Sequence, residues 1–78
     1  MPAGAPQDGV LETLTTRERA ILARVAVGES NAQIAARLSI SEKTVRNHLT
    51  TIFDKLNVTS RAQAIVFARD RGLHGPGA

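Results

Sequence analysis

Residues 30–56 constrain the fold of this chain more than any other stretch, because they carry two helix signals separated by a tight turn. Ser30 is followed three residues later by Gln33, a spacing at which each side chain can satisfy a backbone donor at a helix start. Ser41 is a second candidate for an N-cap. The sequence therefore predicts a short helix and then a longer one, at residues 31–38 and 42–56.

The longer of these predicted helices has two contrasting faces. Its apolar residues repeat at spacings of four, three and four, which is the pattern of a buried stripe: Val45, Leu49, Ile52 and Leu56. The opposite face, on a helix that turns about 100° per residue, carries Lys43, Arg46, Asn47, Thr50 and Asp54. In the major groove of DNA, Arg pairs with guanine, Asn pairs with adenine, and Thr offers a hydroxyl and a methyl.

A solvated amphipathic surface is the ordinary alternative for such a polar face. The short helix placed before it across a tight turn favours DNA recognition, because this is the arrangement of a helix-turn-helix motif. We leave Asp54 out of the expected site, since an acidic group there would more often be solvated or repel phosphate.

Helix signals also flank this pair. Thr15 and Glu18 have the spacing of a capping box, and Gly28 can adopt the left-handed conformation that ends a helix. Ser60 and Gln63 repeat the same capping pattern nearer the C-terminus. These signals predict two further helices, at residues 16–27 and 61–71.

Four helices, together with the lack of any alternating apolar pattern, predict an all-α domain: a four-helix bundle with a helix-turn-helix motif at residues 14–73. Residues 1–13 contain two prolines and two glycines after Met1 and little to bury, so we expect a flexible tail or the remnant of a linker. A frayed C-terminus is expected at residues 74–78.

Composition excludes some classes of function but does not identify the function itself. The net charge of +3 is compatible with a polyanionic partner, and the lack of cysteine excludes disulfides and thiolate metal sites. His48 and His74 have no carboxylate at metal spacing, so we expect no metal, no cofactor and no enzyme activity. No secretory or membrane segment is visible, which makes the cytoplasm the expected location.

Three segments in order, LTTRE, GESNAQIAARLSISEKTVRNHL and KLNVTSRAQA, resemble the DNA-binding domain of LuxR-type transcription regulators. That family supplies the output domains of many bacterial response regulators and quorum sensors. The resemblance covers residues 14–73 and implies that the helix at 42–56 enters the major groove. It implies base contacts from Arg46, Asn47 and Thr50, and phosphate contacts from Lys43, Thr44, Lys55, Ser60 and Arg61.

The resemblance also implies a homodimer on inverted-repeat DNA, packed through the last helix. The chain offers Ala62, Val66 and Arg69 as one exposed stripe there, although a single outward valine is equally ordinary. Thr16 stands where the family commonly has proline, a change with little expected effect. A receiver or sensor domain, absent from this sequence, is a further partner that the resemblance implies, and the sequence leaves open whether the chain is a fragment or a stand-alone small regulator. The alternative function is a module that acts by protein contact, with RNA polymerase or in the manner of a sigma factor.

Overall fold

The computed structural model describes residues 5–73, and the side chains from residue 9 onward. In this part of the chain there are five helices and no strand, which confirms the all-α prediction. The helices are α1 (Ala5–Glu12), α2 (Thr16–Ala26), α3 (Asn31–Leu38), α4 (Glu42–Leu56) and α5 (Arg61–Asp70). The four helices predicted from the sequence are therefore present as α2 to α5, and only α2 and α5 end one residue earlier than expected.

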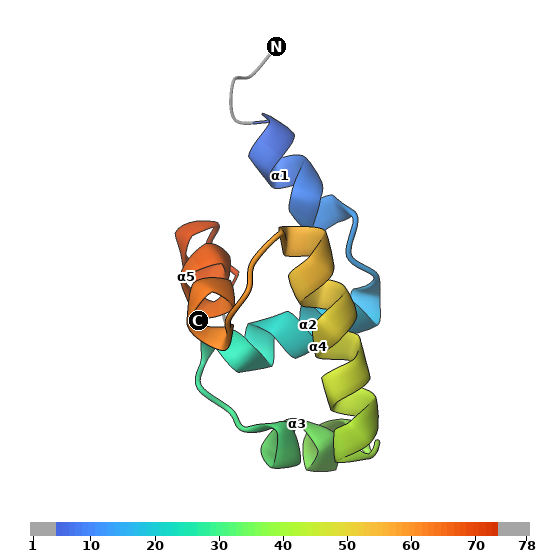
Figure 1. The fold of residues 1–78 in the computed structure, drawn as a ribbon. Coiled ribbons are helices and arrows are strands. Elements are labelled where there is room, and N and C mark those ends of the chain that lie inside the picture. The colour runs from blue at the N-terminus through green and yellow to red at the C-terminus, as the bar shows by residue number, and fades with distance from the viewer. Residues whose placement is uncertain (1–4, 74–78) are drawn as a thin grey trace.

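The expectation of a flexible tail before residue 14 is wrong for Ala5–Glu12, which forms α1. This helix continues beyond the C-terminal end of α4 (Figure 1), and its residues Val10 and Leu11 pack against the core. Arg19 also donates from Nη2 to the carbonyl of Leu11 at 2.9 Å. The sequence signal was missed because two apolar side chains are too few to show a period, and their burial depends on the distant end of α4.

The predicted capping residues begin α2 to α5. Thr15 and Ser30 form complete capping boxes with the residues three positions later, as expected. Ser41 Oγ accepts from the backbone of Thr44 at 3.0 Å. Ser60 Oγ accepts from Gln63 N at 3.1 Å, but Gln63 Oε1 accepts from the backbone of Thr59, so this last box is shifted by one residue.

The C-terminal ends of α2 to α5 share one arrangement. The residue after the last turn of each of these four helices has positive φ: Gly28, Ser39, Asn57 and Gly72. The amide of the following residue then donates to the carbonyl five positions earlier, as Ile40 N does to Ala35 O at 3.0 Å and Val58 N does to Phe53 O at 3.0 Å. This is the Schellman arrangement, which satisfies the carbonyls at a helix end. It sets the tight turn between α3 and α4 through the left-handed Ser39.

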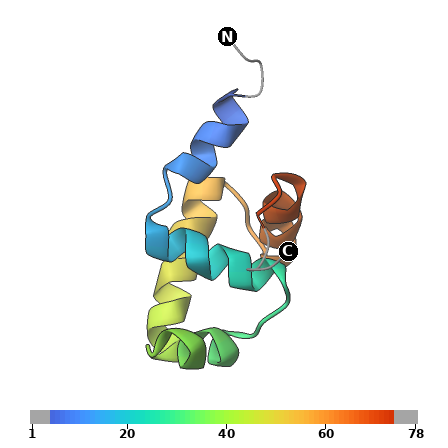
Figure 2. The same cartoon turned by 180° about the vertical axis from the view of Figure 1, so that it is seen from behind.

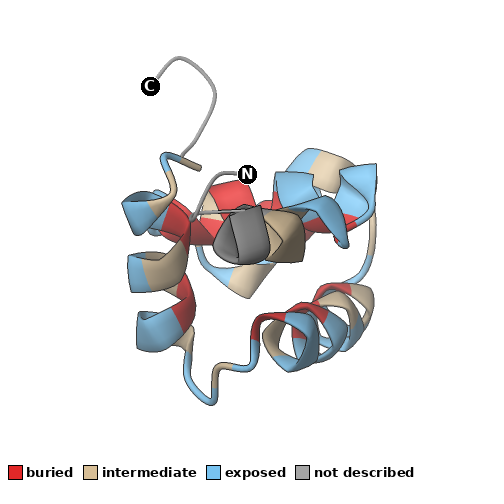
Figure 3. Cartoon of the chain, turned by 90° about the horizontal axis from the view of Figure 1, so that it is seen from above, coloured by how far each residue is buried: buried red, intermediate tan, exposed pale blue. Residues whose placement is uncertain are grey.

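Helix α2 is the central element of the domain. It packs against α4 on one side and against α5 on the other, while α3 packs mainly against the first half of α4 (Figures 1 and 2). The buried faces of the helices point toward a common centre (Figure 3). The largest fully buried side chains come from α2, α3 and α4: Ile21, Leu22, Val25, Ile34, Val45 and Ile52. Since α2 joins α4 to α5, the rigid frame around α4 is built by residues outside the helix-turn-helix.

Candidate nucleic-acid interface

The helix-turn-helix is held together by a close approach of α3 to α4. Ala35 on α3 is buried with an exposed fraction of 6%, and its neighbour Ile34 is completely buried. On α4, the predicted stripe of Val45, Leu49, Ile52 and Leu56 is buried throughout. This packing fixes the orientation of α4 about its own axis, and so determines which of its side chains reach solvent.

The polar side chains predicted to contact DNA lie on the solvent side of α4. Lys43, Arg46, Asn47 and Thr50 are all exposed, and we call these four residues the α4 ridge. Thr44 is half-buried beside them. The three ion pairs found among the described side chains, residues 9–73, use other cations, so no described carboxylate forms an ion pair with Lys43 or Arg46. The outward presentation of the ridge, predicted from the helical period, is thus confirmed, whereas its contacts with DNA stay predictions.

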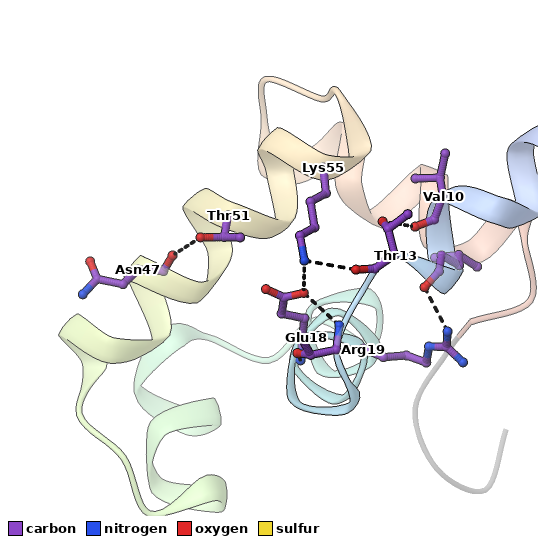
Figure 4. Close-up of polar contacts among 9 residues, drawn as sticks. Val10, Thr13, Glu18, Arg19, Asn47, Thr51 and Lys55 are labelled. Atoms are coloured by element: carbon purple, nitrogen blue, oxygen red, sulfur yellow. Dashed lines mark hydrogen bonds and ion pairs between the residues drawn. The ribbon is translucent and has the colours of Figure 1, made fainter.

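The hydroxyl groups of Thr50 and Thr51 on α4 already have partners within the helix. Thr50 Oγ1 donates to the carbonyl of Arg46 at 3.0 Å, and Thr51 Oγ1 donates to the carbonyl of Asn47 at 3.3 Å. The amide side chain of Asn47 extends away from the body of the domain, whereas the Thr51 hydroxyl turns back to the helix backbone (Figure 4). The ridge therefore presents one ammonium, one guanidinium and one amide as its free polar groups, with the Thr50 side chain between them.

Lys55, expected to contact phosphate, has partners inside the domain. Its Nζ lies 2.8 Å from Glu18 Oε1 and donates to the carbonyl of Thr13 at 3.0 Å (Figure 4). The Glu18 side chain is 8% exposed, while the Lys55 side chain is 33% exposed. Lys55 thus fastens the C-terminal half of α4 to the start of α2, a role that the sequence analysis did not predict. A phosphate contact by Lys55 stays a prediction. Only the third proton of its ammonium group is free to make that contact.

Glu18 is stabilised as a carboxylate at this position. The hydrogen bond from Lys55 is the main cause that holds its pKa below the ordinary value, and the hydrogen bond from the Thr15 backbone adds to it. Burial acts in the opposite direction and is outweighed by the two hydrogen bonds, with smaller electrostatic contributions from Lys55 and His48. Glu18 is therefore ionised at neutral pH, and the charge-assisted hydrogen bond that it accepts from Lys55 binds α2 to α4.

Arg61, which was also expected to contact phosphate at a helix start, makes its hydrogen bonds inside the domain. Its guanidinium donates to Asn31 Oδ1 at 2.9 Å and to the carbonyl of Glu29. The Glu29 carboxylate in turn pairs with Arg37 at 2.9 Å and with Arg24 at 3.4 Å. These contacts join the starts of α3 and α5, so Arg61 fixes their relative position. Ser60 is exposed, and its hydroxyl serves as the cap of α5.

The stripe expected to form a dimer contact, Ala62, Val66 and Arg69, is exposed along α5. Val66 is 57% exposed, the larger value of the two exposed large hydrophobic residues described. A surface hollow of about 520 Å³ lies beside it, lined by Asn57, Val58, Ala62, Gln63, Val66, Phe67, Asp70 and Arg71. The Arg71 guanidinium stacks on the Phe67 ring at 3.7 Å from its centroid. The surface is apolar with a charged edge, and nothing in the described residues covers it.

Groups for other chemistries are not assembled in the part of the chain that the structure describes. Residues 5–73 bring together no cluster of three potential metal ligands, and none of their helices is long and apolar enough to cross a bilayer. His48 is half-buried on α4. His74 lies outside the described residues.

A short helix, a left-handed turn and a second helix with an exposed polar ridge define the chain as a helix-turn-helix domain. The sequence model of the luxR family of bacterial regulatory proteins matches residues 12–68. The match includes α2, α3, α4 and most of α5, and it extends over well more than half of the chain. The chain therefore belongs to the luxR family of bacterial regulatory proteins, a family of DNA-binding transcription regulators.

Individual relatives agree with this assignment. The chain is similar to the probable transcriptional regulatory protein SgaR of Hyphomicrobium methylovorum, at 54% identity over 70% of the chain and 26% of the relative. It is also similar to the nitrate/nitrite response regulator protein NarP of Escherichia coli, at 47% identity over 88% of the chain and 32% of the relative. A nitrate/nitrite response regulator homologue of Haemophilus influenzae is 50% identical over 77% of the chain and 29% of its own length. The chain thus spans less than a third of these relatives.

Proposed function

We propose that this domain binds double-stranded DNA in a sequence-specific manner, with α4 in the major groove, as part of a bacterial transcription regulator. The observation that carries the proposal is the exposure of the whole α4 ridge on a helix whose other face is buried against α2 and α3. The major groove admits one α-helix, and a ridge with two cations and an amide complements its base edges and flanking phosphates.

Each side chain of the ridge has a proposed role. Arg46 suits the two acceptors of guanine and Asn47 suits the acceptor and donor of adenine, while Thr50 meets a base edge one turn beyond Arg46. Lys43 and Thr44 lie in the first turn of α4, where backbone amides and the helix dipole also favour a phosphate. Ser60, Arg61 and Lys55 are proposed as further phosphate contacts. The latter two would have to make those contacts with protons that their internal partners leave free.

Selection of bound sequences from a random double-stranded pool, followed by footprinting, tests this proposal. We expect a conserved half-site that contains guanine and adenine. Arg46→Ala should then weaken binding by roughly 1–3 kcal/mol and relax the preference at one position. Lys43→Ala is the matched control, because loss of a phosphate contact should weaken all sequences alike and reduce the salt slope by about one. Equal losses on selected and random DNA for both variants would contradict the division of roles.

We further propose that two copies bind DNA as a homodimer through Ala62, Val66 and Arg69. The exposed Val66 and the adjoining apolar hollow support this surface as the contact. Binding sites would then be inverted repeats with half-sites about one helical turn apart, ~34–36 Å. Sedimentation of the domain with its selected duplex should give two domains per site, and one domain per site would reject the dimer.

The alternative, a module that acts mainly by contact with RNA polymerase or another protein, is supported by the same uncovered α5 surface. Salt dependence separates the two functions, because groove binding through phosphates should weaken with a log–log slope of about −0.9 per phosphate contacted. Since the match spans less than a third of each relative, we propose that a receiver or sensor domain controls the domain in a longer regulator. Binding to the bacterial chromosome would place it in the cytoplasm.

A further inference from the structure

The state of the Thr50 hydroxyl limits what this residue can recognise. Thr50 is exposed on the α4 ridge, and its Oγ1 donates to the carbonyl of Arg46 at 3.0 Å. A hydroxyl has one proton to donate. With that proton committed to the helix backbone, Thr50 has none left for the acceptors that guanine, adenine and thymine present in the major groove.

The same bond decides which branch of the side chain is offered to a partner. Thr carries a hydroxyl and a methyl on its Cβ, and holding the oxygen against the carbonyl of the preceding turn leaves the methyl as the other branch. The C5-methyl of thymine is the apolar group that base edges show in the major groove. A methyl on the protein and a methyl on the base are therefore complementary without any hydrogen bond.

Thr51 offers an internal comparison for this reasoning. It is also exposed and makes the same kind of bond, from Oγ1 to the carbonyl of Asn47 at 3.3 Å. On a helix with 3.6 residues per turn, Thr50 lies about 40° from Arg46 around the axis, whereas Thr51 lies about 140° from it. Thr51 is thus on the flank of Lys55, which is tied to α2, and away from the Arg46 side of the ridge.

We infer that Thr50 is a specificity-determining residue that selects thymine through contact between the two methyl groups. The inference deepens the proposed binding of α4 in the major groove and rests on it. Two consequences follow from methyl contact. Deoxyuridine, which lacks the C5-methyl, should not replace thymine at this position, and 5-methylcytosine should bind better there than cytosine.

The test uses a duplex selected by the domain, in which each thymine is replaced one at a time by deoxyuridine. For the wild-type chain, we expect one replacement per half-site to weaken binding about fourfold, the factor that corresponds to one buried methyl group. A 5-methylcytosine–guanine pair at that position should bind about fourfold more tightly than a cytosine–guanine pair.

Two substitutions separate the methyl from the hydroxyl. Thr50→Ser keeps the hydroxyl and removes the methyl, so the deoxyuridine effect should disappear. Thr50→Val keeps a methyl and removes the hydroxyl, so the effect should persist. Thr51→Ser is the matched control and should leave the effect of deoxyuridine unchanged. Circular dichroism of each variant verifies that its helix content is retained.

Each outcome has a separate meaning. If the domain selects a duplex but no thymine shows a deoxyuridine effect, or if Thr50→Ser keeps that effect while Thr50→Val loses it, the methyl inference is wrong and DNA binding stands. If no duplex is selected from the pool, the proposed function fails and the inference fails with it.

Discussion

The ion pair between Glu18 and Lys55 gives the most quantitative prediction about the frame that supports α4. Lys55→Met replaces the ammonium with an apolar group of similar length and leaves the Glu18 carboxylate, 8% exposed, with only the backbone of Thr15 as a donor. Removing one partner of a fully buried pair destabilises by ~3–5 kcal/mol. Because the Lys55 side chain is 33% exposed, water already solvates part of the pair, and we expect a loss of about 2 kcal/mol.

For a domain of this size, a loss of that order lowers the melting temperature by ~8–16 °C. Urea unfolding followed by circular dichroism at the helix band measures the loss in the free energy of unfolding, since the chain has no Trp or Tyr for fluorescence. Lys43→Met is the matched control, because Lys43 is an exposed lysine on the same helix, and its loss should stay within about 0.5 kcal/mol. The double variant Glu18→Gln, Lys55→Met should recover part of the stability, because no buried charge is then left unpaired.

The same pair predicts how stability depends on pH. The pKa of Glu18 is lowered in the folded chain, so the unfolded chain binds more protons in acid. The stability from the pair is fully present above the ordinary pKa of 4.5 and is lost as pH falls through the lowered value. The difference between wild type and Lys55→Met should therefore shrink below about pH 4. Equal stability of Lys55→Met and Lys43→Met at neutral pH, or a difference that grows in acid, would refute the reasoning.

Two further predictions concern the helix-turn-helix itself. Ala35→Leu should lower the free energy of unfolding by ~1–3 kcal/mol, because Ala35 is 6% exposed in the core and a larger side chain is expected to overpack the contact between α3 and α4. An unchanged melt would mean that the helices are not in close contact there. Ser39→Gly should raise the free energy of unfolding by about 1 kcal/mol, because Ser39 has φ 59° and glycine adopts this conformation without strain. A lower urea midpoint for Ser39→Gly would contradict the proposed strain at this residue. Ser41→Gly is the control, because Ser41 has φ −81° and its replacement by glycine should give no gain in stability.

Local signals made most of the fold predictable. A capping side chain and its partner lie three residues apart, so the starts of α2, α3 and α5 could be placed from Thr15, Ser30 and Ser60 alone. The four-three-four spacing on α4 also predicted which face would be buried, and therefore which side chains would form the ridge. Asn57 shows the limit of this reasoning, since it ends α4 in a left-handed conformation that the sequence did not predict.

The internal roles of two cations could not be predicted, because their partners are far away in sequence. Lys55 pairs with Glu18 across 37 residues, and Arg61 reaches Asn31 across 30 residues. A Lys or Arg near a DNA-binding helix resembles a phosphate ligand in sequence, whether it faces solvent or a buried carboxylate. Only the packing of the helices, α2 against α4 and the start of α5 beside the start of α3, distinguishes these cases. Helix α1 escaped prediction for a similar reason, because the burial of Val10 and Leu11 depends on the distant end of α4.

Titration of the isotopically labelled domain with its selected duplex, observed by amide NMR, tests most directly whether α4 presents its ridge to DNA. We expect the largest shifts at Lys43, Arg46, Asn47 and Thr50, with shifts that weaken as salt is raised. Large shifts confined to α5 and the hollow beside Val66, with the α4 ridge unaffected, would contradict binding through the major groove.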